Sequence, residues 1–306
     1  MTIEIYCGTH RGLLCLRQLT QSFKGSKFRV FSFKEEPWEP AFFGNIKRFC
    51  KENQIEFRKW PVPKNEPPSI QEQPADVIIA ISWRFLIPSS IYTRAIRGAY
   101  VFHDSLLPKY RGFSPTVWAI LNGERRTGVS LIEMAEGVDT GAIYRQISIQ
   151  IKPDQQIKEV MQEVNDTYLK IIKEDLGKVI CGKLKPRRQK EANATYCCKR
   201  IPADAKIDWS KTALEICDLV RASSSPYPGA YFTFENQNIR CWLAKIDDSG
   251  KKHVGLIPGR VIGFGIGGSI LVGTGRGSVE LKEVERPGKS PESPRNFINK
   301  LSATLG

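Results

Sequence analysis

A histidine and an aspartate, each on a short segment that ends in glycine, are the residues of this sequence best suited to chemistry. His103 follows the apolar run Ala99 to Phe102 and precedes the letters DSLLPKYRG. Asp139 lies between glycines in the segment Gly137 to Gly141. An imidazole and a carboxylate at strand ends are typical of general acid–base catalysis. The alternative interpretations are a buried structural histidine and an ordinary turn aspartate.

Length and composition indicate a globular protein with more than one domain. The chain has 306 residues, of which 41% are hydrophobic and 25% are charged, and two domains are typical of this length. No apolar run is long enough for a membrane span, and the first residues are typical of a strand, so we expect a cytoplasmic protein. The eight cysteines lack the paired spacing of a zinc site. We expect them to be reduced, mostly buried and free of metal.

The excess of positive charge favours a negatively charged partner without identifying it. The formal net charge is +14, which would attract RNA, membrane phosphates or a small molecule linked to a nucleotide. The basic residues are spread along the chain, and their densest cluster, Lys183 to Lys190, is short. A solvated basic surface is the simplest interpretation of this charge.

Strands that alternate with helices in the first part of the chain predict a doubly wound, mostly parallel α/β sheet. In such sheets ligands bind beyond the carboxyl ends of the strands. His103 and the triplet Ser82-Trp83-Arg84 both come at such ends, which favours a site there. The expected elements are strands at Ile3 to Cys7, Lys27 to Phe33 and Asp76 to Ile81, and helices at Gly12 to Phe23 and Ala41 to Ile55.

The later part of the chain predicts a second, smaller domain. Asp154 to Cys181 has the apolar spacing of a long amphipathic helix, and the basic, polar segment Gly182 to Ala194 is typical of a linker. From Thr195 onward, one helix is followed by several short strands with glycine turns, a pattern typical of a small β-barrel. We therefore expect one domain at residues 1–194 and a barrel domain at residues 195–306.

The two segments His103 to Gly112 and Gly137 to Gly141, taken together, resemble the formyltransferases that use 10-formyltetrahydrofolate. This family includes methionyl-tRNA formyltransferase and the amino-sugar N-formyltransferases. Gly8-Thr9 and the stretch Ser82 to Pro88 match the family after the first and the central strand. The later letters IDWS and YPGA, at residues 207–210 and 227–230, resemble the opening of the family's C-terminal barrel. The resemblance implies a Rossmann-like formyltransferase domain followed by an OB-like barrel.

The resemblance also implies roles for individual residues. His103 and Asp139 would be catalytic, with His103 as a donor to the oxyanion and Asp139 as the group that orients it and takes the proton of the attacking amine. The co-substrate would be 10-formyltetrahydrofolate, and no metal is expected. His10 and Arg111 would contact the formyl acceptor. The folate pocket would be formed by Trp83, Arg84, Phe85, Leu86, Ile87, Leu107, Glu136 and Val138.

One position departs from the family pattern. The family has an asparagine two residues before the histidine, where this chain has Val101. A valine side chain cannot donate a hydrogen bond, and loss of one oxyanion donor typically lowers turnover by about 10²–10³-fold. Either Ser105, Asn122 or a bound water replaces it, or the protein is slow, or it does something other than formyl transfer.

The acceptor is the least determined part of this hypothesis. The segment Lys34 to Pro40 is acidic, where methionyl-tRNA formyltransferases carry a basic insertion, and this disfavours tRNA. Ala41 to Gly44 resembles the same region of enzymes that act on nucleotide-linked amino sugars, so such a sugar is the first expectation. Other small amines such as hydroxyornithine, methionyl-tRNA, a folate-binding relative with little catalysis, and an RNA-binding barrel stay as alternatives. A homodimer also stays open.

Overall fold

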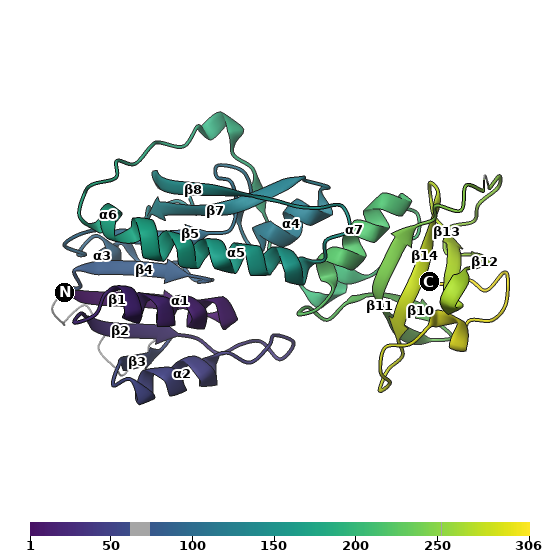
Figure 1. The fold of residues 1–306 in the computed structure, drawn as a ribbon, viewed down its shortest axis with the longest axis horizontal. Coiled ribbons are helices and arrows are strands. Elements are labelled where there is room, and N and C mark those ends of the chain that lie inside the picture. Colours follow the sequence, from purple (N-terminus) through teal and green to yellow (C-terminus); the bar gives the residue numbers. More distant parts are fainter. Residues whose placement is uncertain (62–73, 252) are drawn as a thin grey trace. The chain divides into compact units, whose positions relative to one another are not determined.

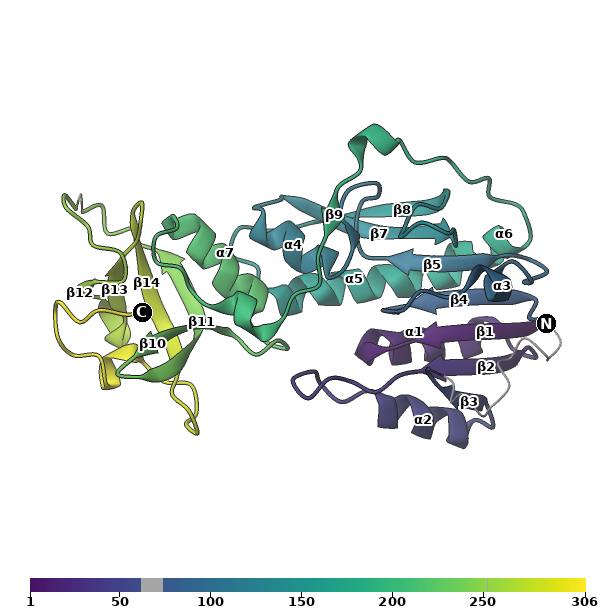
Figure 2. The ribbon, with the colours of Figure 1, turned by 180° about the vertical axis from the view of Figure 1, so that it is seen from behind.

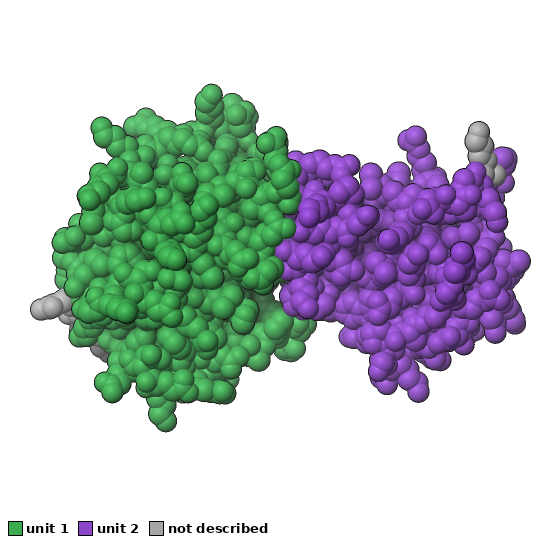
Figure 3. Space-filling view, viewed as in Figure 1, with its two compact units in different colours: residues 1–115, 126–150, 161–199 green, residues 116–125, 151–160, 200–306 purple. Residues whose placement is uncertain are grey.

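A computed structural model describes residues 1–61, 74–251 and 253–306 of the chain. The described residues divide into two compact units (Figure 3). Residues 1–115, 126–150 and 161–199 form the first unit, and residues 116–125, 151–160 and 200–306 form the second. The chain passes from the first unit to the second for the last time between Lys199 and Arg200.

A seven-stranded sheet forms the centre of the first unit (Figure 1), in the order β3-β2-β1-β4-β5-β7-β8. The first five of these strands pair in parallel, and the last two pair antiparallel. The prediction of a doubly wound, mostly parallel sheet is confirmed. The strands are β1 (Thr2–Cys7), β2 (Lys27–Ser32), β3 (Glu56–Lys59), β4 (Val77–Ile81), β5 (Ala99–His103), β7 (Arg126–Glu133) and β8 (Ile143–Gln150).

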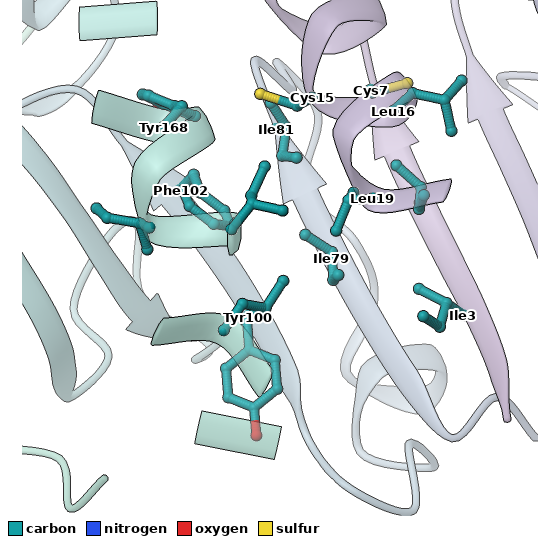
Figure 4. Close-up of a cluster of buried hydrophobic side chains, with 14 of the residues drawn as sticks. Ile3, Cys7, Cys15, Leu16, Leu19, Ile79, Ile81, Tyr100, Phe102 and Tyr168 are labelled. Carbon is teal, nitrogen blue, oxygen red and sulfur yellow. The ribbon is translucent and has the colours of Figure 1, made fainter. Parts of the chain in front are cut away.

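Three longer helices pack on one face of this sheet: α1 (Thr9–Ser22), α2 (Phe43–Glu52) and α5 (Ile157–Ile171). In Figure 4, side chains of α1 and the ring of Tyr168 from α5 point towards residues of β4 and β5. Helix α5 continues through a π-helical turn at Ile172–Leu176 into α6 (Gly177–Ile180), as the long amphipathic pattern predicts. The short helices are α3 (Ser89–Tyr92) and α4 (Pro115–Leu121).

Strand β5 separates core side chains from site side chains by simple alternation. Tyr100 and Phe102 are buried in the cluster under α1 and α5, and Phe102 stacks on Tyr168 with ring centroids 5.2 Å apart. Successive side chains of a strand point to opposite faces. Val101 and His103 therefore face the other side of the sheet, where the apolar cluster that includes Ile78 and Ile91 lies.

The second unit holds a five-stranded antiparallel sheet in the order β10-β11-β14-β13-β12. Helix α7 (Ala213–Ser223) begins with a capping box between Thr212 and Glu215, which satisfies free backbone amides at its first turn. Residues of α7 and all five strands share one buried core. The prediction of a separate β-fold in the later part of the chain is thus confirmed. Its strands are β10 (Ala230–Phe234), β11 (Gln237–Ile246), β12 (Val261–Phe264), β13 (Ile270–Gly273) and β14 (Ser278–Glu285).

The remaining elements are short. Strand β6 (Arg111–Gly112) pairs in parallel with β9 (Tyr196–Cys197) within the first unit. Short 3₁₀ turns lie at Glu191–Asn193, Pro202–Ala205, Ile266–Gly268 and Pro294–Asn296. Within the described parts of the chain, no helix combines the length and the apolar character that a bilayer crossing requires.

The cysteines follow the expectation that most are buried. Cys7, Cys15, Cys50, Cys217 and Cys241 are buried, and Cys181 and Cys198 are exposed. Burial disfavours the charged thiolate and raises the pKa of Cys15 and Cys50 to about 12. Since the thiolate is the reactive form, these buried thiols are inert in the folded protein.

Alkylation of the native protein near neutral pH should therefore be selective. We expect Cys181 and Cys198 to react first with iodoacetamide, and Cys197 more slowly because burial raises its pKa to about 11. The five buried cysteines should react only after unfolding in guanidinium. Peptide mass spectrometry at successive times measures this order, and early labelling of Cys15 or Cys50 would contradict the described packing.

Candidate active site

His103 ends β5 with both ring nitrogens facing oxygen atoms of the protein. Its Nε2 lies 2.8 Å from the carbonyl oxygen of Tyr110, and its Nδ1 lies 3.4 Å from Oδ2 of Asp139. The side chains of His103 and Asp139 are only 7% and 13% exposed. A carbonyl oxygen can only accept, so Nε2 carries a proton. Nδ1 and the carboxylate are then positioned to share or exchange one further proton.

The backbone conformation of the Asp139 loop depends on the residue types at positions 139 and 141. Asp139 has a φ of +54°, a left-handed conformation that aspartate tolerates better than most residues. At Gly141, a Cβ would lie 1.7 Å from the carbonyl oxygen of Glu133, so only glycine fits there. This geometry turns the carboxylate towards the His103 loop, where Oδ2 also accepts a 2.8 Å hydrogen bond from the amide of Gly112.

Left-handed residues gather near the carboxyl ends of the strands. Thr9 and Ser82 follow β1 and β4 with φ values of +63° and +49°, and Tyr110 has a φ of +61°. Such conformations cost free energy in residues other than glycine, and they cluster at functional sites where the surrounding structure maintains them. Together with Asp139, they mark this end of the sheet as the candidate site.

Asp104, the residue after His103, is anchored on the helix side of the sheet. Its Oδ2 pairs with Nη1 of Arg11 at 3.3 Å, and its Oδ1 lies 3.5 Å from the hydroxyl of Tyr168. Arg11 also donates a 2.7 Å hydrogen bond to Asn165 and lies over the Tyr168 ring. Burial raises the pKa of Tyr168 well above its usual value, so its hydroxyl keeps its proton. This polar cluster fixes the end of β5 from behind.

The predicted folate loop after β4 divides into packed and exposed side chains. Trp83 meets the rings of Phe33 and Phe85 edge to face, at 5.3 and 5.6 Å, and its buried Nε1 has no hydrogen-bond partner among the described residues. Ile87 is 9% exposed and belongs to an apolar core cluster. Phe85 and Leu86, by contrast, are 39% and 73% exposed. Phe85 and Leu86 are therefore the apolar side chains of this loop that a ligand can reach.

Arg84 connects the loops that follow β2 and β4. Its Nη2 donates to both carboxylate oxygens of Glu39, at 2.6 and 2.8 Å, and its guanidinium lies 4.4 Å from the centre of the Phe33 ring. In the second predicted folate loop, Glu136 and Val138 are exposed. The two loops thus present several accessible groups, although the Arg84 guanidinium is already paired.

Leu107 and Val101 belong to one apolar environment beside the site. Leu107 is 2% exposed and packs in a cluster with Ile132 and Ile143, against which Val101 also packs. Val101 occupies the position of the asparagine in the family that the sequence resembles, and its neighbours here are therefore apolar. Ser105 does not supply the missing donor, because its buried hydroxyl already donates a 2.7 Å hydrogen bond to the carbonyl of Lys109.

The two residues predicted to contact the acceptor have different surroundings. His10 is exposed in the first turn of α1. Arg111 is fully buried and donates to both carboxylate oxygens of Glu191 at 2.8 Å, and this contact raises the pKa of its guanidinium. We therefore correct the interpretation of Arg111. Its donors serve an internal ion pair and are not presented to a substrate anion.

Several groups around His103 could not be predicted from the sequence. The Tyr110 carbonyl and the Gly112 amide are backbone groups, whose direction no residue type reveals. Gln189, which donates to the carbonyl oxygens of Asp139 and Gly141, lies in the segment interpreted as a linker. Among the described residues, no three histidine, cysteine, aspartate or glutamate side chains group as metal ligands.

Two matches to known protein families cover most of the chain. Residues 43–176 match the family described as formyl transferase, and residues 200–302 match the formyl transferase C-terminal domain. The chain belongs to the formyl transferase family. It is therefore a formyltransferase by family, as the two motif segments indicated.

Solved structures of formyltransferases share the fold of this family member. WlaRD, a sugar 3N-formyl transferase solved with dTDP and 5-N-formyl-THF, is 18% identical with a TM-score of 0.68 over 95% of this chain and 99% of its own. The N-formyltransferase from Helicobacter canadensis, solved with folinic acid and dTDP-3-aminofucose, is 17% identical with a TM-score of 0.68, over 91% and 98%. Methionyl-tRNA formyltransferase from Clostridium thermocellum is 21% identical with a TM-score of 0.52, over 82% and 95%.

Nuclear magnetic resonance of the histidine rings can test the His103 contacts, because the chain has only three histidines. We expect a protonated Nε2 at His103, and a shift of its ring signals in Asp139→Asn while those of His10 and His253 stay unchanged. Asp166→Asn, which changes an exposed aspartate of α5, is the matched control. His103 signals that are the same in Asp139→Asn and in the wild type would rule out the described contact.

Proposed function

We propose that this formyltransferase moves a formyl group from 10-formyltetrahydrofolate to the primary amine of a small molecule, with an amino sugar linked to a nucleotide as the acceptor. The observation that carries the proposal is the 3.4 Å contact between Nδ1 of His103 and Oδ2 of Asp139 at the carboxyl end of β5. This contact supports a site there, because ligands of such sheets bind beyond the carboxyl ends of the strands. A cytoplasmic location, expected from the sequence, belongs to the same proposal.

The protein's task in this reaction is to move one proton. The amine nitrogen forms a bond with the formyl carbon, and the bond from that carbon to N10 of the folate breaks. The nitrogen loses a proton to the pair of Asp139 and His103, which returns it to N10, so that no other reactant is needed. Because Nε2 of His103 already donates to Tyr110, the contacts favour this proton relay over the oxyanion-donor role inferred from the family.

The exposed groups on the two predicted folate loops fit a folate. Phe85, Leu86 and Val138 present apolar side chains on the two predicted loops, with 39%, 73% and 48% exposure. An aromatic heterocycle such as a pterin gains free energy from contact with such surface. These loops would hold the co-substrate next to Asp139, and the formyl group that it carries supplies the electrophile.

The surroundings of Arg84 support a small acceptor over tRNA. The segment after β2 contains Glu35, Glu36 and Glu39, and an acidic loop repels a nucleic-acid backbone. Glu36 also lies 3.9 Å from Lys199, so part of this charge is paired within the unit. Two of the similar solved structures contain dTDP or a dTDP-linked aminofucose, which supports a nucleotide-linked amino sugar as the acceptor class.

A direct assay tests the reaction and the acceptor together. We expect release of tetrahydrofolate from 10-formyltetrahydrofolate only when a dTDP-linked amino sugar is present, and a formylated sugar in the mass spectrum. Asp139→Asn and His103→Gln should each lower turnover by about 10²–10⁴-fold, while Asp166→Asn should not. Formylation of methionyl-tRNA would overturn the acceptor, and no transfer to any amine in a broad panel would overturn the reaction.

A second candidate is a folate-binding relative with little catalysis, and the apolar neighbours of Val101 favour it. If a missing donor limits turnover, Val101→Asn should raise it by up to about 10²-fold, while Val101→Ala should not. The amide should also lower the free energy of unfolding by about 1–3 kcal/mol, measured by thermal melting, because it enters an apolar cluster. Turnover that is unchanged or lower in Val101→Asn would exclude this limitation.

A further inference from the structure

Residues 187–197, called the strap below, run from the edge of the sheet to both site loops. Backbone hydrogen bonds in both directions join Arg187 to Ile143 at the start of β8, at 2.8 and 2.9 Å. Figure 2 shows the segment after α6 following the β8 side of the sheet before it reaches β9. From the sequence, most of this segment is expected to be a linker. Its hydrogen bonds instead attach it to the sheet and to the site loops.

The strap holds the loop that supplies one oxygen to His103. The amide of Tyr110 donates a 2.8 Å hydrogen bond to Oγ1 of Thr195, and the amide of Arg111 donates one of the same length to the Thr195 carbonyl. The Thr195 amide donates in turn to the Pro108 carbonyl at 3.2 Å. Thr195 thus accepts two hydrogen bonds and donates one, and these fix the backbone on both sides of the Tyr110 carbonyl.

The strap also holds the loop that supplies the second oxygen. The side-chain amide of Gln189 donates to the carbonyl oxygens of Asp139 and Gly141, at 2.7 and 2.8 Å. Its oxygen accepts a hydrogen bond from Nη2 of Arg111 at 3.0 Å. One glutamine therefore joins the Asp139 loop to the residue that follows Tyr110.

A buried cation keeps the strap on the two loops. The Arg111 guanidinium is 0% exposed and would be strongly destabilised without partners. Glu191 of the strap supplies both carboxylate oxygens, and the hydrogen bond from Arg111 lowers the pKa of Glu191. The Tyr196 hydroxyl accepts a further bond at 3.0 Å. Detachment of the strap would leave this cation unpaired, so the attached state is strongly favoured.

From these contacts we propose that Gln189 and Thr195 are positioning residues that set the distance between His103 and Asp139. This inference rests on the proposed function for its catalytic consequence. The two oxygens that face the imidazole come from separate loops, and the strap is hydrogen-bonded to each of these loops. A displacement of about 1 Å in an active site can lower turnover by about 10²-fold, so a change in the strap should act on the chemical step.

Kinetics of a matched pair of glutamine variants test the proposal. Gln189→Leu keeps the side-chain size but removes both donated hydrogen bonds, and we expect kcat to fall by about 10–100-fold while KM for each substrate changes by less than about twofold. Gln162→Leu, which alters an exposed glutamine of α5, should keep wild-type values. An unchanged kcat in Gln189→Leu would overturn the proposal.

A threonine series gives a second test that does not depend on the folding of Gln189→Leu. Thr195→Val removes the hydroxyl that accepts from the Tyr110 amide, and Thr195→Ser retains it. We expect kcat to fall in Thr195→Val and to remain near wild type in Thr195→Ser. Equal losses in the two variants would show a role in packing alone and would overturn the positioning role.

Histidine resonances separate failure of this proposal from failure of the proposed function. The ring signals of His103 should move in Gln189→Leu and Thr195→Val and stay in place in Gln162→Leu, whether or not the protein transfers formyl groups. If the His103 signals do not move, the strap does not position the pair, even where the melting temperature falls. If the wild type is inactive but these signals move, the proposed function fails and the positioning stands.

Discussion

An imidazole held between two oxygens from different loops is the constraint on which the rest of this structure depends. His103 faces the Tyr110 carbonyl on one side and the Asp139 carboxylate on the other. The sequence next to His103 does not by itself bring either oxygen close to the ring. Each of the two loops turns towards the ring through a residue in the left-handed conformation, Tyr110 in one and Asp139 in the other. The surrounding fold fixes the positions of these two loops.

The sheet fixes the position of the strand that carries His103. Strand β5 pairs in parallel with β4 and antiparallel with β7, so it lies inside the sheet and cannot shift without breaking two ladders. Its Phe102 is buried against Tyr168, and Asp104, directly after His103, is paired with Arg11. Buried polar groups of this kind are costly to leave unpaired. The position of His103 is therefore fixed from the helix side before any ligand binds.

On the opposite face of β5, packing and the expected chemistry favour different residues. Val101 shares an apolar cluster with Leu107, Ile132 and Ile143, which stabilises the strand end that carries His103. A polar donor at this position would interrupt that cluster, whereas an apolar residue leaves the developing oxyanion with one fewer donor. The chain has the apolar residue, and the contact between His103 and Asp139 lies at the end of the same strand.

The sequence by itself determined the alternation of strands and helices, the second β-fold and the two motif segments, because periodicity and glycine placement are local properties of the chain. It also gave His103 and Asp139 as candidates, and the folded chain brings Nδ1 of His103 within 3.4 Å of Oδ2 of Asp139. Only the tertiary structure decided that Arg111 is an internal cation, that Ile87 and Leu107 are packed, and that residues 187–197 form a strap. Many of the strap's contacts involve backbone carbonyls and amides, which every residue type carries, so their partners depend on distances that only the folded chain sets.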